Sequence, residues 1–347
     1  MSSSAQFSEH TAPLQGLEPR LSITLGDEVP RSQAGQNLLL GFHFGRSKPE
    51  PSDPALVSIG VDPVGSDDLY ECWWYDGAVE HSMSGRARIL RCDDFAAIVV
   101  QVPDAPPENF HALTVEVYEE LLQAVNGIGG VQLARIWNYF SNINEGDGDQ
   151  EKYRQFSIGR AEVFESFGLN DASVPTGTAV GSARDCDFSV VALATRHHFR
   201  NVENPRQVSA FRYPRDYGPR SPKFSRGGCV ITGGQHLQLI SGTAAIIGHE
   251  SVHAGDTALQ CKETLANLQQ LCDAMSLIEG AGARVVLDDQ AALRVYLRDP
   301  ADRPFVDARL REFLGGESRT IAFLNADICR SELQLEIEAA RVVGAVS

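Results

Sequence analysis

The chain has 347 residues, of which 43% are hydrophobic and 22% charged, and its formal net charge is −16. These values are typical of a globular protein with one large core or two linked subdomains. The negative charge disfavours binding to nucleic acid and to anionic lipid, so we expect neither as a partner. Because no apolar run is long enough to cross a bilayer and the N-terminus lacks secretory features, we also expect a cytoplasmic protein without membrane contact.

The cysteines are seven, an odd number, and they are widely scattered and never spaced as CxxC. This pattern argues against a disulfide framework and against a structural zinc cluster. We therefore expect reduced thiols and no bound metal. The residues concerned are Cys72, Cys92, Cys186, Cys229, Cys261, Cys272 and Cys329.

The first 130 residues predict a flexible arm followed by a strand-rich subdomain. Residues 1–20 contain Ser and Pro without apolar periodicity, which is typical of a flexible N-terminal arm. Within residues 38–102, short apolar runs alternate with Gly, Pro and Asp clusters, which indicates several strands joined by turns. A helix is predicted over residues 106–130, with Gly127 as its stop. We assign residues 21–130 to an N-terminal subdomain.

Residues 131–347 predict a second subdomain in which sheet and helices recur. Helical spacing of apolar residues predicts helices over 152–168, from Asp256 to about Ile278, and over 301–314, each flanked by strand patterns. This second half resembles the first in the order of its elements, without visible sequence identity. The sequence therefore predicts an α+β protein whose two halves each pack a mixed β-sheet on helices.

The last predicted strand places polar side chains in a row, because successive residues of a strand face opposite sides of the sheet. The row consists of Glu332, Gln334, Glu336 and Glu338. One interpretation is a solvated face, which is the common case. The other is a cleft, where crowded carboxylates raise one another's pKa and leave one of them protonated as a general acid.

Cations and tyrosines gather in one Pro- and Gly-containing loop, which includes Tyr213, Tyr217, Arg220, Lys223 and Arg226. The planar guanidinium of arginine pairs bidentately with a carboxylate, and tyrosine hydroxyls donate to the same oxygens, so the loop fits a small organic dianion. The five cations between Arg212 and Arg226 are too few to bind a duplex. The alternative is a surface loop that neutralises an acidic protein.

A second candidate pair lies on the helix predicted over residues 152–168. Tyr153 and Arg160 are seven residues apart, which places them near one face of that helix and about two turns from each other. An exposed helix surface explains this spacing as well as a binding site does.

The segment HESVH matches the HExxH pattern of zinc hydrolases, with His249 and His253 as metal ligands and Glu250 as base. That pattern requires a helix, whereas Gly248 precedes it and a turn leads into the helix that begins near Asp256. We therefore interpret the match as fortuitous. No phosphate loop and no dinucleotide-binding motif is present, so no cofactor is expected.

Five ordered blocks between Arg135 and Ala340 resemble the signature blocks of the chorismatase family. They are RIWNYFSNIN, YRQFSIGRAEVF, YPRDYGPRSPKFSRG, SGTAAIIGHESVHAGD and NADICRSELQLEIEA. The carboxyl end also resembles the RidA (YjgF) fold. The resemblance implies two RidA-like halves, the C-terminal one catalytic, and an enzyme that removes the enolpyruvyl group of chorismate as pyruvate, in secondary metabolism.

The resemblance also implies roles for individual residues. Glu336 matches the acid that protonates the enolpyruvyl methylene, and Glu338, on the same strand face, is the alternative. Four residues match positions that hold the substrate carboxylates, and Arg220 and Tyr217 lie in the same block as support. The four are Tyr153, Arg160, Tyr213 and Arg226.

Two further positions, Gly242 and Cys329, are associated in this family with the product that is formed. Alanine at both is typical of the branch that hydrolyses chorismate to a diol, and glycine with cysteine of the branch that forms 3-hydroxybenzoate. The resemblance therefore implies a 3-hydroxybenzoate synthase. For Cys329 the alternative is a small buried hydrophobe. Other open readings are a chorismate hydrolase, a mixed 3-/4-hydroxybenzoate synthase, and a non-catalytic RidA-like module that binds small carboxylates. The assembly state, including a monomer, is left open.

Overall fold

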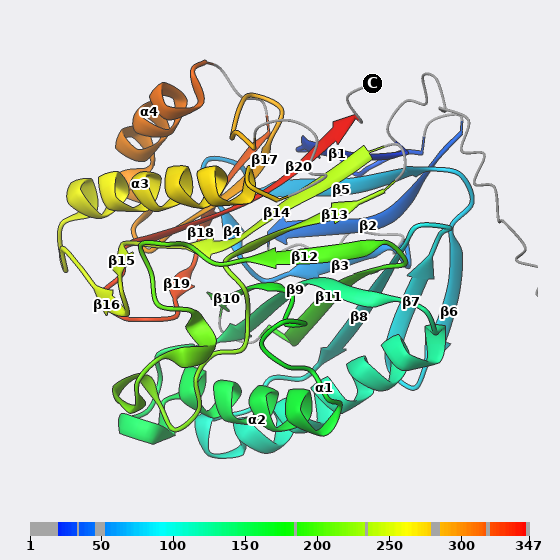
Figure 1. Cartoon of the computed structure of the whole chain (residues 1–347), viewed down its shortest axis with the longest axis horizontal. Helices are drawn as coiled ribbons and strands as arrows, with labels where there is room; N and C mark the ends of the chain where they lie inside the picture. The colour runs from blue at the N-terminus through cyan, green and yellow to red at the C-terminus, as the bar shows by residue number, and fades with distance from the viewer. Residues whose placement is uncertain are drawn as a thin grey trace, which may run out of the picture.

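The computed structural model describes residues 20–32, 35–45, 53–183, 186–232, 235–278, 285–316 and 320–344. Three β-sheets surround a common core, and helices cover the outer faces of two of them (Figure 1). The predicted α+β class with mixed sheets packed on helices is confirmed. The predicted arm lies outside the described residues except for Arg20. None of the described helices is both long and apolar enough to cross a bilayer.

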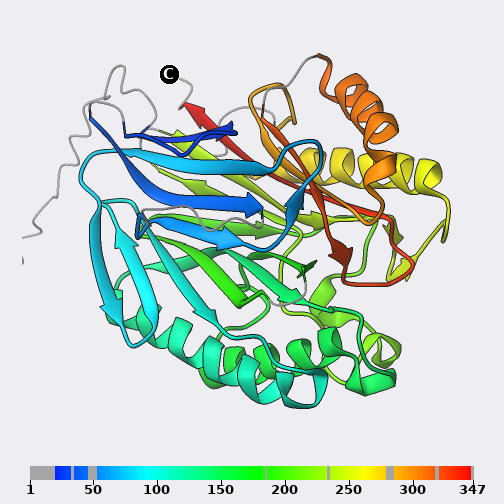
Figure 2. The same ribbon diagram turned by 180° about the vertical axis from the view of Figure 1, so that it is seen from behind.

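The N-terminal sheet has four strands. In spatial order they are β1 (Leu21–Gly26), β5 (Asp68–Asp76), β2 (Gln36–Gly45) and β3 (Leu56–Ile59). β2 is buried along most of its length, as its continuous apolar run requires. Its side chains and those of β5 pack in the core that all three sheets share, and Figure 2 shows these strands, in blue and cyan, from the opposite side.

The second sheet has seven strands. In spatial order they are β19 (Asp327–Ile328), β10 (Thr176–Ser182), β9 (Gln132–Ser141), β11 (Phe188–Thr195), β8 (Phe95–Val102), β7 (Ala87–Arg91) and β6 (Glu80–Ser84). Two helices, α1 (Pro107–Ile128) and α2 (Lys152–Ser166), cover its outer face. The predicted apolar stripe of α1 is buried there, but the helix continues past Gly127 and ends at Gly129, whose φ of 68° suits glycine.

The third sheet also has seven strands. In spatial order they are β12 (His198–Val202), β13 (Gly227–Ile231), β14 (Gln235–Thr243), β20 (Leu335–Gly344), β17 (Ala292–Leu297), β18 (Ile321–Asn325) and β4 (Asp62–Pro63). Two helices, α3 (Thr257–Met275) and α4 (Arg303–Leu314), cover its outer face. The side chain of Asp256 caps α3 by accepting a hydrogen bond from the Leu259 amide.

The second and third sheets repeat one topology. Each is built from three antiparallel strands, a helix, a strand, a second helix, a parallel strand, and a last strand inserted in the middle of the sheet. β19 and β4 pair antiparallel with corresponding edge strands, β10 and β18. The strand pairing places the division between the two units near residues 196–197, whereas residue 130 falls between α1 and β9 inside the first unit. The last strands, β11 and β20, occupy matching places.

Candidate active site

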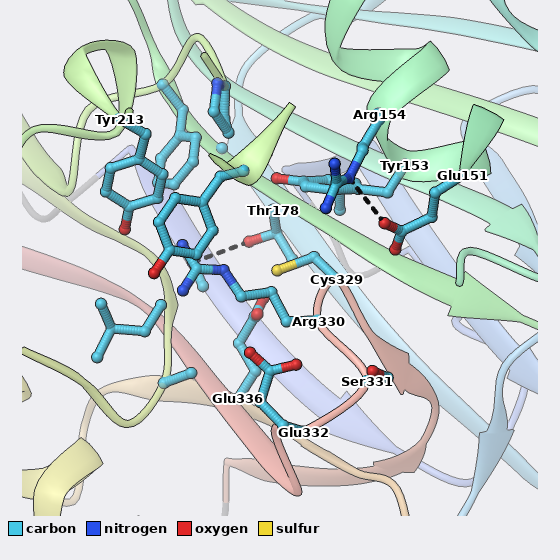
Figure 3. A pocket seen from close by; sticks show the side chains of 18 of the residues that line it. Glu151, Tyr153, Arg154, Thr178, Tyr213, Cys329, Arg330, Ser331, Glu332 and Glu336 are labelled. Carbon is cyan, nitrogen blue, oxygen red and sulfur yellow. Dashed lines mark hydrogen bonds and ion pairs between the residues drawn. The ribbon is translucent and has the colours of Figure 1, made fainter. Parts of the chain in front are cut away.

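A cavity of about 240 Å³ lies where the two repeated units meet (Figure 3). The first unit contributes α2 and β10, and the second contributes β14, β20 and the segment after β19. The loop over residues 207–224 supplies tyrosines and Phe224 to its wall. The predicted residues that line the cavity are Tyr153, Arg160, Tyr213, Tyr217, Arg226, Gly242, Cys329, Glu332 and Glu336.

Glu336 is the buried carboxyl group of this cavity, with 4% of the residue exposed. It lies on β20, whose next inward residue is Glu338. Burial, and then the negative charge of Glu338, raise the pKa of Glu336 to about 8, although Arg135 and Arg226 oppose the shift. At neutral pH the Glu336 carboxyl therefore carries a proton, as a general acid must.

Glu338 is buried as well, but arginines and hydrogen-bond donors surround its oxygen atoms. Arg135 lies 2.5 Å from one oxygen, and Arg294 lies 3.1 Å from the other. The indole of Trp137 donates a hydrogen bond at 3.0 Å, and the hydroxyl of Tyr296 donates another at 3.2 Å. Glu338 does not line the cavity, so its position does not fit the role of the acid.

The predicted polar row is only partly a strand face. β20 begins at Leu335, so Glu332 and Gln334 precede the strand. Glu332 is half-buried and lines the cavity. The inward side chains of β20 at this end are therefore Glu336 and Glu338, and both are shielded from water.

Gly242 leaves the space that the Glu336 carboxyl occupies. The register between β14 and β20 shifts between Ile240 and Thr243, so Gly242 lies in an irregular part of the pair. A β-carbon at Gly242 would lie 1.9 Å from Oε1 of Glu336. The Gly242 amide donates a hydrogen bond to the Thr178 hydroxyl at 3.1 Å. A side chain at this position must displace the Glu336 carboxyl.

Arg160 is a buried cation without a carboxylate partner in the described part of the chain. Only 3% of the residue is exposed, and its Nε and one terminal nitrogen have no hydrogen-bond partner. Its guanidinium lies 4.6 Å from the centroid of the Phe156 ring. Burying an unpaired charge is costly, so this geometry fits a site that receives an anion.

A buried ion pair anchors the first turn of α2, which carries Tyr153 into the cavity. The ammonium of Lys152 donates to both oxygens of Asp104, at 2.9 and 2.8 Å. Asp104 also accepts from the amide and hydroxyl of Ser141 at the end of β9. This contact fixes the start of α2 against the sheet, so the side chain of Tyr153 is held in place. Burial raises the pKa of the Tyr153 hydroxyl, which stays a neutral donor.

Arg226 and Tyr213 form a second polar group in the cavity. Arg226 precedes β13, and a terminal nitrogen of its guanidinium donates to the Tyr213 hydroxyl and, at 3.2 Å, to the Val208 carbonyl. Its Nε has no hydrogen-bond partner. The amide of Arg226 donates to the buried carboxyl of Glu203 at 3.2 Å. This arrangement leaves donor capacity for a ligand.

Cys329 reaches the cavity because β19 pairs with β10 of the other unit. The pairing joins Ile328 to Val180, and Cys329 follows directly. Burial, and then the Glu336 carboxyl, raise the pKa of the Cys329 thiol to about 12. Cys329 is therefore a neutral thiol at neutral pH, which can give up its proton only transiently.

Arg220 does not line the cavity, contrary to its predicted role in binding. It forms an ion pair with Glu165 near the end of α2, and both side chains are partly exposed. The nearby carboxylate of the exposed helix face attracts the guanidinium, so the loop turns this arginine away from the cavity. The interpretation of Arg220 as a surface cation fits this position.

Sequence reasoning missed Thr178 and Arg330, which also line the cavity. Arg330 donates to the His249 carbonyl at 2.9 Å, and its guanidinium lies 3.9 Å from the ring centroid of Tyr217. In Figure 3 its side chain extends towards the tyrosines of the loop. Arg330 directly follows Cys329, so the sequence could have indicated that it lies near the cavity. Nothing in the local sequence marks Thr178 as a cavity residue.

The HESVH segment forms a hairpin rather than a helix. β15 (Ile246–Ile247) and β16 (Glu250–Ser251) pair, and His249 lies in the turn between them. The His249 ring contacts the Tyr217 hydroxyl at 3.3 Å, whereas His253 lies 3.5 Å from Glu263. The two imidazoles therefore have separate partners, and no group of metal ligands was found among the described residues.

Comparisons with known proteins identify the family. A protein named chorismatase from Streptomyces rapamycinicus is 36% identical over 273 residues, which are 77% of this chain and 80% of the relative. This chain belongs to the chorismatase family. A protein named 3-hydroxybenzoate synthase from Streptomyces hygroscopicus is 32% identical over 294 residues, which are 82% of this chain and 84% of that protein.

Structural comparison agrees with this family. A crystal structure of a chorismatase has a TM-score of 0.82 and 29% identity, and it covers 93% of this chain and 98% of its own. The family model described as "Chorismatase FkbO/Hyg5-like, N-terminal" matches residues 71–194, which end where the first repeated unit ends. The YjgF protein of E. coli covers 41% of this chain with a TM-score of 0.27. The duplication of the two units is inferred from the matching strand orders of the second and third sheets.

The buried proton of Glu336 predicts a pH-dependent stability. Between pH 4.5 and about 8 the unfolded chain releases this proton while the folded chain keeps it, so the free energy of unfolding falls as the pH rises. Glu336→Gln removes this dependence. We expect the variant to gain about 2–4 kcal/mol relative to wild type between pH 5 and pH 9, measured by urea unfolding. The surface variant Glu116→Gln is the control, and parallel pH curves for Glu336→Gln and wild type would contradict the assignment.

Proposed function

We propose that this chorismatase converts chorismate to 3-hydroxybenzoate and pyruvate, with Glu336 as the general acid. The observation that carries the proposal is a buried carboxyl with a raised pKa in a cavity that also contains buried guanidinium groups without carboxylate partners. The names of the relatives, chorismatase and 3-hydroxybenzoate synthase, support the substrate and the product.

The charges of the cavity suit a dianion such as chorismate. Arg160 comes from the first unit and Arg226 from the second, so two carboxylates can each find a cation. Arg330 adds a third positive charge beside the tyrosines. These cations act at contact distance, whereas the acidic surface acts through screened, longer-range interactions. The net charge of −16 therefore does not prevent binding of an anion.

The chemistry starts with proton transfer from Glu336 to the methylene carbon of the enolpyruvyl group. The neighbouring ring hydroxyl then attacks the ring carbon that carries the oxocarbenium-like ether. The bond between that carbon and the ether oxygen breaks, and the side chain leaves as pyruvate. The hydroxyl proton returns to Glu336. The epoxide that has formed then opens at its bond to the carbon that first carried the hydroxyl. The oxygen stays on the carbon that carried the ether and gains a proton, while that carbon loses its own proton, which gives the phenol. The atoms of the two products equal those of the substrate, so no water is consumed.

Gly242 and Cys329 lie beside this reaction path. Gly242 gives the acid its place, and the thiol of Cys329 borders the same space as Tyr153 and Glu336. We assign Cys329 to proton transfer during aromatisation: its thiol gives a proton to the epoxide oxygen, and the thiolate that results takes the ring proton. We place the reaction in the cytoplasm, in line with the reduced thiols among the buried cysteines, which are Cys72, Cys92, Cys229, Cys261 and Cys272.

The first test is product formation by wild type and by Glu336→Gln. Purified wild type incubated with chorismate is expected to release pyruvate and 3-hydroxybenzoate, followed by chromatography, with turnover that declines above about pH 8. Glu336→Gln keeps the shape but not the proton, so turnover is expected to fall by about 10²–10⁴-fold. A non-catalytic carboxylate-binding module releases no pyruvate at any protein concentration, and near-normal turnover of the variant contradicts the role of Glu336.

Arg160→Ala tests carboxylate recognition. Since two nitrogen atoms of the buried guanidinium have no hydrogen-bond partner among the described residues, its removal is expected to raise KM by about 10-fold or more, which corresponds to the loss of one charge-assisted hydrogen bond. Arg220→Ala, which removes a surface cation outside the cavity, is the matched control and should leave KM unchanged. An unchanged KM for Arg160→Ala rules out its role in binding.

The double substitution Gly242→Ala and Cys329→Ala tests the product branch. We expect pyruvate release with part of the product diverted from 3-hydroxybenzoate to the non-aromatic diol, which chromatography separates. Gly242→Ala alone should lower turnover, because its β-carbon displaces the Glu336 carboxyl. If the double variant still yields pure 3-hydroxybenzoate, the branch assignment is wrong. A mixture of 3- and 4-hydroxybenzoate from wild type identifies the mixed synthase instead.

A further inference from the structure

Four charged side chains of alternating sign form a buried series of ion pairs, Glu71–Arg294–Glu338–Arg135, whose third member lies two residues from Glu336 on β20. Glu71 of β5 accepts two hydrogen bonds from Arg294 of β17, at 2.6 and 2.7 Å. Arg294 also lies 3.1 Å from Glu338 of β20, and Glu338 lies 2.5 Å from Arg135 of β9. All four residues are buried, and all three sheets contribute to the chain.

The chain is electrically balanced without Glu336. It contains two carboxylates and two guanidinium groups, so its formal charge is zero. Trp73 donates to Glu71 at 2.8 Å, and the Tyr139 hydroxyl accepts from Arg294 at 2.7 Å. Glu336 lies two residues from Glu338. If Glu336 ionised, this series of ion pairs would offer no further cation to balance its negative charge. Ionisation of Glu336 therefore places two carboxylates side by side in a region of low polarity.

Stability alone does not explain this arrangement. A buried ion pair costs a large desolvation energy, and well-packed apolar residues of similar volume often stabilise a fold equally well. The cluster nevertheless lies among apolar and aromatic side chains, where Arg294 stands 4.0 Å from the Phe42 ring centroid. Within this cluster Glu338 is held by Arg135 and Arg294, and it is the next inward residue after Glu336 on β20.

Other charged and titratable groups face Glu336 from each element packed against it. They are Glu338 on β20, Tyr296 on β17, Arg135 on β9, Tyr153 on α2, Arg226 before β13, and Cys329, Arg330 and Glu332 after β19. Tyr153 and Cys329 are neutral at physiological pH, for the reasons given above. Arg135 is engaged by Glu338, whereas Arg226 faces the cavity where the substrate binds. Among the described residues of this set, Glu338 is the closest fixed negative charge along the strand.

We propose that Glu338 is a positioning residue whose buried, ion-paired carboxylate keeps the Glu336 carboxyl protonated, and that the N-terminal sheet supports it through Glu71. This inference rests on the proposed function. After Glu336 has given its proton to the substrate, it stands as a carboxylate beside Glu338. Repulsion between the two charges favours recapture of the proton from the ring hydroxyl, which restores the acid for the next turnover.

The test compares pH profiles of kcat/KM for variants that remove or keep the charge. Glu338→Gln is expected to move the alkaline limb down by about one pH unit, because the like charge beside Glu336 is lost. Glu338→Asp keeps the charge and is expected to keep the limb at its wild-type position, even with a lower rate. Glu263→Gln, which removes another ion-paired glutamate outside the cavity, is the matched control.

Glu71→Gln is the second variant, in case Glu338→Gln does not fold. It removes the carboxylate at the far end of the chain, and a smaller shift in the same direction is expected. If the alkaline limb of the kcat/KM profile stays at its wild-type position in a folded variant, Glu338→Gln or Glu71→Gln, the proposal is overturned. A purely structural role leaves the pH profile unchanged.

A separate readout distinguishes this inference from the proposed function. If wild type releases no pyruvate, the proposed function fails, and the pH dependence of urea unfolding then reports the proton of Glu336 without catalysis. In Glu338→Gln the fall of stability with pH should end at a lower pH than in wild type. Superimposable unfolding profiles overturn the role of Glu338 in that case too.

Discussion

The chemistry that we propose for this cavity depends on a single buried carboxyl next to a fixed negative charge. Glu336 is shielded from water and lies two residues from Glu338, whose charge Arg135 and Arg294 hold in place. Burial and repulsion act in the same direction, so the carboxyl keeps its proton near neutral pH. The surrounding guanidinium groups do not cancel this effect, because several of them are already paired while Arg160 and Arg226 keep donors for a ligand.

The duplicated topology explains why the Glu336 carboxyl lies in a cavity between the two units. The last strand of each unit lies in the middle of its sheet, and in the second unit that strand carries Glu336. β19 extends across to β10 of the first unit and delivers Cys329 to the same space. At the matching position of the first unit, β11 carries only apolar and small residues, FSVVALAT. An acid is therefore present on only one of the two corresponding strands.

The N-terminal sheet closes the structure from the third side. Its aromatic strands fill the core that the three sheets share, and Glu71 neutralises Arg294 in that core. Without this carboxylate, Arg294 would be a buried cation shared only with Glu338. The sheet thus contributes to the charge balance around Glu338, although none of its described residues lines the cavity.

The sequence by itself predicted the class, the main helices and many of the residues that line the cavity. Periodicity located α1 to α4, and the family blocks located Glu336, Arg160, Arg226, Gly242 and Cys329, which the fold brings together. Local pattern could not tell a solvated polar strand from a buried one, because alternation is the same in both. Three features depended on contacts between residues more than 50 positions apart. They are the direction of Arg220, the choice of Glu336 rather than Glu338 as the unpaired carboxyl, and the point at which the repeat divides. Only the tertiary structure fixes such contacts, since burial and charge pairing arise from strands that meet after folding.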